Sequence, residues 1–463
     1  MLPAIIVKYE NWEEKAMLSK KDFYKMVISM VIPIALQNLI NVGVQAADVL
    51  MLGKVSETVL SASSLGGQIS YIMTLIFFGI TSGTTVLTAQ YWGKQDLDAI
   101  ERILGIALKI AVIVSCLFMA AAIAVPELLM KIYTSEPDVI AEGVKYLRIV
   151  CFAYILMAVS MVYLNVLKSM ERVVIATICY GASFLTNVAI NALLIFGLGP
   201  FPKMGIMGAA VGTLCARIVE VLIICIYAGK KSVPIRFRGR YFWHMDKVLL
   251  KDFLIFSLPV VLNELMWGLG TSMNTAVMGH LGKAVVAANS VAQVIRQLVT
   301  VVGFGIASVG AIVIGKTIGQ GEMKAAEVYG KYIIQLTVLV SLIGAGLVLV
   351  LRPLMLNQME MTAQAKSYLS MMMFVMSYFV ICQMYNSTMV VGIFRGGGDT
   401  KFGLILDVTT MWCCSIVFGA LAAFVWKFPV TIVYMILLGD EVIKIPLTTW
   451  RYKQKKWLRD VTR

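Results

Sequence analysis

The sequence predicts an all-α polytopic membrane protein with twelve transmembrane helices, arranged as two pseudo-symmetric bundles of six. Three observations lead to this fold class. Of the 463 residues 59% are hydrophobic and only 14% are charged, and the mean hydropathy is +0.84, outside the range of soluble globular chains. Apolar segments long enough to cross a membrane recur along the whole chain. The second half of the chain also repeats landmarks of the first half at a constant spacing.

Twelve segments are expected to form the membrane-spanning helices, because about 20 apolar residues at ~1.5 Å per residue cross a hydrocarbon core of ~30 Å. Several of them exceed this minimum, so we expect them to be tilted or bent. In chain order they cover 27–52, 59–91, 102–126, 139–167, 173–198, 204–228, 253–280, 286–315, 330–351, 364–394, 402–426 and 430–449.

The repeat has a spacing of 226 residues and runs without a gap through the first two spans of each half. Proline and glycine alter the backbone in specific ways, so their recurrence is more informative than that of apolar residues. The landmarks pair Pro33 with Pro259, Asp48 with Asn274, Phe78-Gly79-Ile80 with Phe304-Gly305-Ile306, and Gly93 with Gly319. Because six helices per half is an even number, the halves are parallel repeats about an axis along the membrane normal.

This organisation divides the chain into five segments. They are an N-terminal segment 1–26, an N-terminal lobe 27–228, a basic linker 229–252, a C-terminal lobe 253–449 and a basic tail 450–463. The first segment has no small-residue cleavage site after a short apolar core, so no cleavable signal peptide is expected. Two bundles around a central axis are typical of an alternating-access transporter.

The net charge of +14 is distributed in a way that sets the orientation of the chain. With both termini in the cytoplasm, the cytoplasmic segments hold 27 Lys and Arg and the opposite loops hold six, as the positive-inside rule requires. We therefore expect a multi-pass protein of the cell membrane that contacts lipids and not nucleic acid. The tail "RYKQKKWLR" is expected to anchor at the inner leaflet.

A carboxylate interrupts the first span, in "AADVLMLG", and ionisable residues at membrane depth are functional hypotheses. This Asp48 lies below the outer end of its helix, where simple hydration is the alternative interpretation. Asn187 and Asn191 share one helix face at a spacing of four, and Thr213 enters from the same side. All four side chains fall within ~9–17 Å of one surface. One carboxylate, two amides and a hydroxyl form a ligand set suited to Na⁺ or a proton.

A second group of polar residues lies in the C-terminal half and could bind substrate or a second coupling ion. Glu264 is near mid-membrane in "PVVLNELMWGLG", with Asn263 and Trp267 beside it. Arg296, in the next span, is a candidate counter-ion for Glu264, and Asn274 is the repeat partner of Asp48. A hydrogen bond of Glu264 between helices, without a functional role, is an equal alternative.

Two further groups are expected to have structural roles. Arg217 and Glu220 are three residues apart on one span and should pair with each other. Asp407 is near the cytoplasmic end of its span, where an interfacial position accounts for its charge.

No catalytic or metal-binding arrangement is evident, so we expect neither an enzyme nor a cofactor, apart from a coupling Na⁺. His244 and His280 are isolated, and the eight cysteines lie in apolar spans without metal-ligand spacing. The stretch "GAIVIGKT" (310–317) matches the P-loop pattern, but it lies within a long apolar span with no strand before it. That match is accidental.

Several stretches together resemble the multidrug and toxic compound extrusion (MATE) family. They are "IPIALQNLI" with "AADVLMLGKV", the repeat "LPVVLNELMWGL" with "MNTAVMGHLG", and "YWGKQD", "FLTNVAINALLIFG", "MGIMGAAVGT" and "GIFRGGGDT". The resemblance covers essentially the whole chain. It implies twelve helices in two lobes and cation-driven export of organic, often cationic, compounds.

The resemblance also implies a cation or proton site in the N-terminal lobe. Asp48, Asn187 and Thr213 match the family's aspartate of helix 1, asparagine of helix 5 and threonine of helix 6. Asn191 falls where some members carry an aspartate, and the helix 10 aspartate of some bacterial members is missing around 384–386. With one carboxylate left in the site, Na⁺ and H⁺ both stay open as the coupling ion.

The expected function is secondary antiport, in which inward Na⁺ or H⁺ drives export of amphipathic or cationic organic compounds by a monomer. The alternative is an exporter or flippase of a lipid-linked precursor or metabolite. That function would call for a larger cationic cleft, whereas the deep basic residues of this chain are scattered.

Overall fold

The computed structural model describes residues 18–462 except 231–232, 236–238, 244–245 and 360, and all its elements within that part of the chain are helices. The predicted all-α class is confirmed. The N-terminal half contains α1 (Lys20–Gly53), α2 (Glu57–Gly93), α3 (Leu97–Ala124), α4 (Pro126–Lys131), α5 (Pro137–Val150), α6 (Ala153–Ser169), α7 (Val174–Phe196) and α8 (Ile206–Ala228).

The linker contains the short helix α9 (Gly239–Trp243), and the C-terminal half follows it. Three stretches of that half, η1 to η3, are π-helical. The elements are α10 (Lys247–Gly279), α11 (Lys283–Gly319), α12 (Met323–Gln358), α13 (Ala363–Ser387), η1 (Thr388–Phe394), α14 (Thr400–Asp407), η2 (Val408–Ile416), α15 (Val417–Ala420), η3 (Leu421–Val425), α16 (Val430–Leu437) and α17 (Asp440–Lys453).

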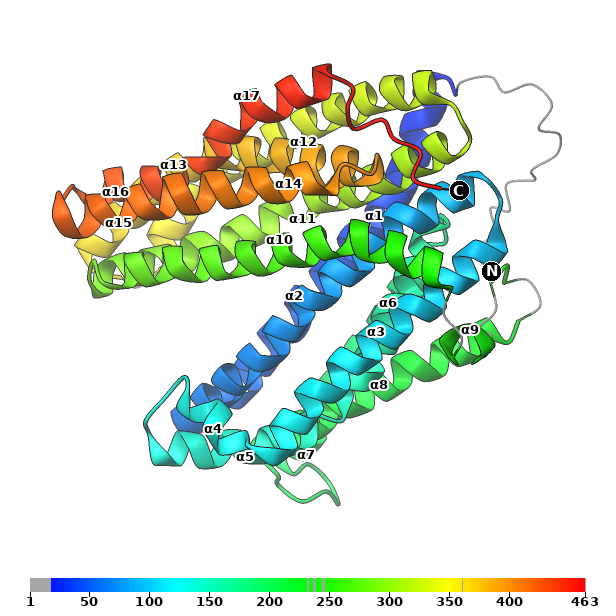
Figure 1. The fold of residues 1–463 in the computed structure, drawn as a ribbon. Coiled ribbons are helices and arrows are strands. Elements are labelled where there is room, and N and C mark those ends of the chain that lie inside the picture. The colour runs from blue at the N-terminus through cyan, green and yellow to red at the C-terminus, as the bar shows by residue number, and fades with distance from the viewer. Residues whose placement is uncertain (1–17, 231–232, 236–238, 244–245, 360, 463) are drawn as a thin grey trace.

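Nine helices of the described chain are long and apolar enough to cross a membrane, or ten if α5 and α6 form one span. The sequence predicts a single helix over 139–167, but the chain bends there by 52° between α5 and α6. The two remaining expected spans correspond to α10 and to the α16–α17 pair, which lie in the same bundle as their neighbours (Figure 1).

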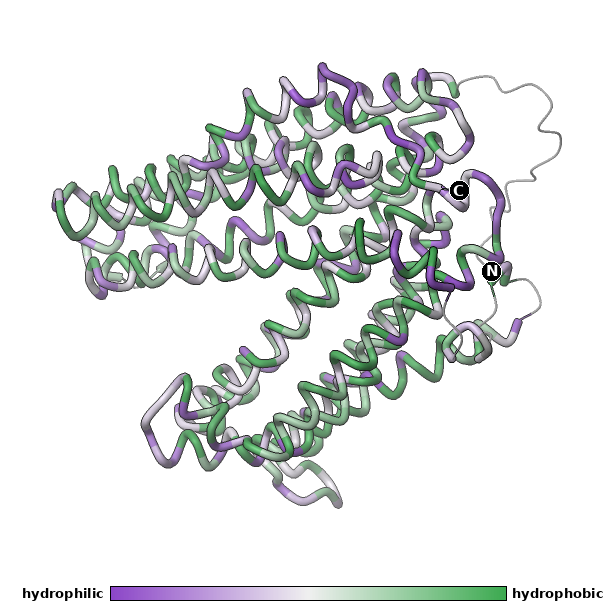
Figure 2. The backbone as a smooth tube through the Cα atoms, in the orientation of Figure 1, coloured by the Kyte–Doolittle hydropathy of each residue, from purple (hydrophilic) through white to green (hydrophobic). Residues whose placement is uncertain are grey.

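The helices form two bundles that meet at one end and diverge toward the other, so that the molecule has the outline of a V (Figure 1). The C-terminal end of the chain and α9 lie at the joined end. Figure 2 shows hydrophilic residues gathered at that end and mostly hydrophobic residues along the arms. This distribution is the one expected when the arms cross a membrane.

The repeat is visible in the element boundaries themselves. α1 ends at Gly53 and α10 at Gly279, and α2 and α11 begin and end 226 residues apart. The turn after each long helix contains a left-handed residue at the same place, Gln95 with φ 59° and Gly321 with φ 81°. The two halves therefore share local structure down to single turn residues.

Glycines allow the two halves to approach closely near the joined end. A Cβ on Gly93 of α2 would overlap the carbonyl oxygen of Lys316 on α11, and a Cβ on Gly319 would overlap that of Gln90. Gln90 and Lys316 are themselves repeat partners, so the contact is reciprocal, as a local two-fold axis requires. The helices α2 and α11 thus cross at the pseudo-symmetry axis.

The first helix of each half packs partly against the opposite lobe, a contact that the division into 27–228 and 253–449 does not describe. Phe23 and Val27 of α1 are buried in a core made mainly by C-terminal helices. Leu249 and Phe253 of α10 are buried in the core of the N-terminal lobe. Position in the sequence assigns each helix to one lobe. Near the joined end, however, α1 packs into the core of the C-terminal lobe and α10 packs into the core of the N-terminal lobe.

The basic tail, for which an anchoring role at the inner leaflet stays a prediction, packs against the helices of both lobes. Trp457 is fully buried and stacks on Tyr452 with ring centroids 5.4 Å apart. The buried amide of Gln90 donates to the Arg459 carbonyl at 3.0 Å and accepts from the Val461 amide at 2.8 Å. Since Gln90 belongs to α2, the tail fastens the C-terminal lobe to the N-terminal lobe.

Candidate coupling site

The register between α1 and α7 places Asp48 against the polar face of α7. The buried Gln37 of α1 donates to the carbonyl of Val173 at 3.1 Å and to the hydroxyl of Thr177 at 2.9 Å. Thr177 in turn donates to the carbonyl of Pro33 at 3.2 Å. These contacts fix the two helices side by side, so that three helical turns further on Asp48 lies opposite Asn191.

The amide of Asn191 joins the three polar side chains of the site. Its Nδ2 donates to Asp48 Oδ1 at 2.6 Å and to Asn187 Oδ1 at 3.2 Å. Asn187 and Asn191 are buried, and Asp48 is half-buried. A Cβ on Gly212 of α8 would overlap Asn191 Oδ1, so this glycine leaves the space that the Asn191 side chain occupies.

The site has more hydrogen-bond acceptors than donors. Asn191 Oδ1 is buried with no partner among the described residues, and Asp48 has no Lys or Arg within ion-pair distance there. Arg217 of α8 interacts electrostatically with Asp48, but its ion pair is with Glu220 at 2.7 Å, as predicted. A carboxylate and unshared carbonyl oxygens in a membrane-spanning bundle suit a bound Na⁺ or a proton.

Thr213 follows Gly212 on α8 but makes no hydrogen bond with Asp48, Asn187 or Asn191 in the described part of the chain. The sequence analysis did not single out Tyr146 of α5 as a site residue, yet its hydroxyl interacts electrostatically with Asp48. The pairing of Tyr146-Leu147 with Tyr368-Leu369 in the repeat was the available signal for this position.

The partner expected for Glu264 was wrong. Its Oε1 pairs with Arg395 Nη1 at 2.8 Å, and the same guanidinium group donates to Ser82 of α2 at 3.2 Å. The side chain of Arg395 is only 5% exposed, because this residue directly follows η1 within the bundle. Glu264 therefore lies at a contact between the lobes.

Arg296 points instead toward a small cavity of about 40 Å³ in the C-terminal lobe, which it lines together with Asn274 and Tyr434. Asn274 donates to the carbonyl of Leu437 at 3.3 Å. The two other residues of the predicted group are not part of this cavity lining: Asn263 is buried, and Trp267 is half-buried on the same helix. The predicted second group thus falls into separate places.

A comparison with family models decides what kind of protein carries this site. The MatE family matches residues 33–193 and 259–421, and the two matches begin at repeat partners. The chain belongs to the MATE family. The fold of this MATE transporter, its duplicated halves and the predicted family resemblance therefore agree.

Curated relatives extend over most of the MATE transporter. It is 22% identical over 462 residues to "Uncharacterized transporter YisQ" of Bacillus subtilis (strain 168), covering 98% of this chain and 99% of the relative. It is also 22% identical over 404 residues to "Probable multidrug resistance protein NorM" of Rhizobium meliloti (strain 1021), covering 86% and 85%.

Solved structures support the fold. A MATE in the bent conformation matches with a TM-score of 0.84 at 18% identity, covering 94% of this chain and 97% of that one. An outward-facing conformation of a multidrug resistance MATE family transporter matches with a TM-score of 0.81 at 18% identity, with the same coverage. At this identity the likeness concerns the fold alone.

Proposed function

We propose that this MATE transporter is a secondary antiporter that exports amphipathic or cationic organic compounds in exchange for inward Na⁺ or H⁺. The observation that carries the proposal is the carboxylate of Asp48, which is held by Asn191 at 2.6 Å and has no counter-cation within ion-pair distance among the described residues. A lone carboxylate at membrane depth is costly unless a cation or proton compensates it.

Exchange requires that this site is reached from one side of the membrane at a time. The arms diverge away from the joined end, and the crossing of α2 and α11 at Gly93 and Gly319 is a natural pivot (Figure 1). With the positive-inside orientation, the joined end is cytoplasmic and the arms separate toward the outside. Ion binding at Asp48 would favour one arrangement of the arms over the other.

The joined end contains contacts that must break if the arms are to separate on the cytoplasmic side. Lys316 of α11 pairs with Glu171 of the N-terminal lobe at 2.8 Å, and Lys94 pairs with Asp460 of the tail at 3.2 Å. Each contact joins the two lobes, so each stabilises the present arrangement.

The substrate class rests on the relatives, several of which carry the name "Probable multidrug resistance protein". Efflux from proteoliposomes tests the function directly, with a pH gradient and a Na⁺ gradient imposed separately on a fluorescent organic cation. We expect one of the two gradients to drive export against the substrate gradient. If neither gradient drives export, the antiporter proposal is wrong.

A further inference from the structure

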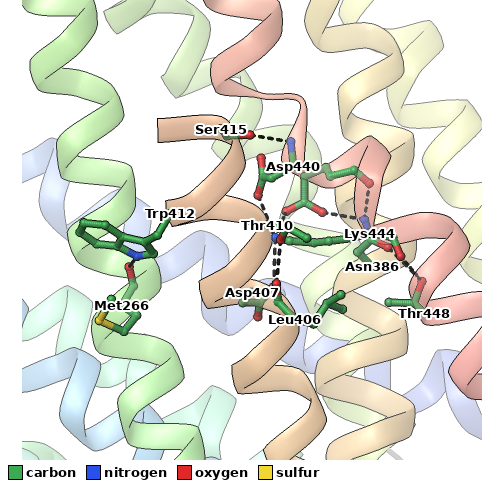
Figure 3. A network of polar contacts seen from close by, with 11 residues as sticks. Met266, Asn386, Leu406, Asp407, Thr410, Trp412, Ser415, Asp440, Lys444 and Thr448 are labelled. Atoms are coloured by element: carbon green, nitrogen blue, oxygen red, sulfur yellow. Dashed lines mark hydrogen bonds and ion pairs between the residues drawn. The ribbon is translucent and has the colours of Figure 1, made fainter. Parts of the chain in front are cut away.

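A second buried ionic cluster lies within the C-terminal lobe, apart from Asp48 (Figure 3). The ammonium group of Lys444 on α17 contacts Asp407 Oδ1 at 3.0 Å, Asp440 Oδ2 at 2.8 Å and Glu441 Oε1 at 3.2 Å. An ammonium group has three N–H donors, so each donor is directed to a different carboxylate. Asp407, expected at the membrane interface, is in fact part of this cluster.

The charges of the cluster do not balance. Three carboxylates face one ammonium group, and their side chains are between 8% and 16% exposed, while that of Lys444 is 2% exposed. No other Lys or Arg in the described part of the chain lies within ion-pair distance of these carboxylates. The N-terminus of α17 favours the carboxylates of Asp440 and Glu441 in its first turn, but it supplies only about half a charge.

In the described part of the chain, the neighbouring helices add hydrogen-bond donors and acceptors to the cluster but no cation. Asn386 of α13 donates to Glu441 Oε2 at 2.8 Å, and Ser415 of η2 accepts from the Asp440 amide at 2.8 Å. The thiol of Cys382 on α13 is the other titratable group that interacts with Glu441. Gln383, on the face of α13 that carries Asn386, is 6% exposed and its Oε1 has no partner among the described residues. These described side chains therefore supply no positive charge that would balance the three carboxylates.

From this geometry we infer that Asp407, Asp440, Glu441 and Lys444 form a proton-binding site that holds one proton in the present arrangement of the lobes. Protonating one carboxylate reduces the net negative charge of the cluster from −2 to −1, and the helix N-terminus offsets part of the remaining charge. The proton comes from water and forms an O–H bond without breaking any other bond. The site is separate from Asp48, so the inference does not depend on the ion that Asp48 binds.

The cluster binds a proton because three carboxylates exceed one ammonium group. Removing any one of the three carboxylates should therefore release the bound proton. We suggest infrared spectroscopy of the full-length transporter in lipid nanodiscs at about pH 7, where ordinary carboxyl groups are ionised. All variants carry Asp48→Asn, so that Asp48 cannot contribute. In this background we expect a C=O band of a protonated carboxyl group. Asp407→Asn, Asp440→Asn and Glu441→Gln should each abolish the intensity of one carboxyl group.

Two further variants make the result interpretable. Glu327→Gln is the matched control, because Lys455 at 2.6 Å lowers the pKa of this cytoplasmic carboxyl group and keeps it ionised, so the band should not change. Lys444→Met removes the ammonium group and should increase the band. Comparable intrinsic fluorescence and melting identify the variants that fold. A band that is absent in the Asp48→Asn background, or that survives in every folded carboxylate variant, would overturn the inference.

Discussion

At the scale of single residues, the proposed coupling site depends on how Asn191 is held. Asn191 donates the only hydrogen bond that Asp48 accepts among the described residues. Gly212 has no side chain, and this leaves space for the amide group of Asn191. Nearby polar groups thus orient the carboxylate without neutralising it. A charge held in this way stays available to a cation or a proton that arrives from solution.

Gly212→Ala should therefore weaken coupling, because its Cβ would displace the Asn191 amide from Asp48. A hydrogen bond to a charged group contributes about 1.5–3 kcal/mol, so we expect the apparent affinity for the coupling ion to fall about tenfold or more. Gly181→Ala on α7 is the matched control, since nothing lies within 4 Å of its Cβ. Equal ion dependence in both variants would contradict the role given to Asn191.

The pair of Glu264 and Arg395 makes a prediction about stability. Glu264→Gln leaves the guanidinium group, 5% exposed, without a counter-charge, whereas Arg395→Gln leaves a carboxylate that is 20% exposed. Removing one partner of a buried pair costs about 3–5 kcal/mol, and the more buried group should suffer more. We expect Glu264→Gln to lower the melting temperature more than Arg395→Gln does. The opposite order of melting temperatures would show that Glu264 is not the main partner of Arg395.

Individual partners were harder to predict than individual site residues. The sequence places Asp48, Asn187 and Asn191 at one depth, because helix rise converts position into depth. It could not pair Glu264 with Arg395, because Arg395 directly precedes a glycine-rich stretch that resembles a loop in sequence. The charges Asp440, Glu441 and Lys444 inside an apolar segment were a visible signal that the sequence analysis did not use.

At the scale of helices, the duplication locates helix ends that composition alone does not locate. The starts of α2 and α11, and those of α3 and α12, are repeat partners, so a helix end in one half predicts the end in the other. The bend after Val150 could not be foreseen, because no proline or glycine marks it. The exchange of α1 and α10 between lobes also depends on tertiary packing, which periodicity does not encode.

The crossing of α2 and α11 makes the sharpest prediction at this scale. Gly93→Ala and Gly319→Ala each place a Cβ on backbone of the opposite helix, so overpacking should cost about 1–3 kcal/mol in the present arrangement. Distances between spin labels on the two lobes near the joined end should increase in both variants. Gly67→Ala of α2, with nothing within 4 Å of its Cβ, should leave them unchanged. Unchanged distances in all three would mean that the glycines do not set the crossing.

At the scale of the whole molecule, the V shape and the charge distribution together give an orientation. The basic tail is docked at the joined end, where it contacts Gln90 of α2 and Lys94, the residue that follows α2. If that end is cytoplasmic, the molecule is joined inside and its arms separate outside. Opening on the other side would then require the tail contacts to break.

Labelling of introduced cysteines checks this orientation. In a cysteine-free background, a cysteine at Lys455 should resist an impermeant thiol reagent in intact cells, whereas one at Lys203, between α7 and α8, should react. Permeabilised cells provide the control, because there the first position should react as well. The reverse pattern in intact cells would invert the orientation and the side on which the arms separate.

The most direct test of the central claim is gradient-driven efflux by Asp48→Asn in proteoliposomes. Asn is close to Asp in size and carries no charge, and the repeat already has Asn274 at this place, so folding should be preserved. Glu264→Gln is assayed beside it as the control in the other half, below its melting temperature, because loss of the Arg395 pair should destabilise it. We predict that Asp48→Asn abolishes export driven by either gradient while the protein still inserts and melts cooperatively. Normal gradient-driven export by Asp48→Asn, with coupling lost in Glu264→Gln, would contradict the account.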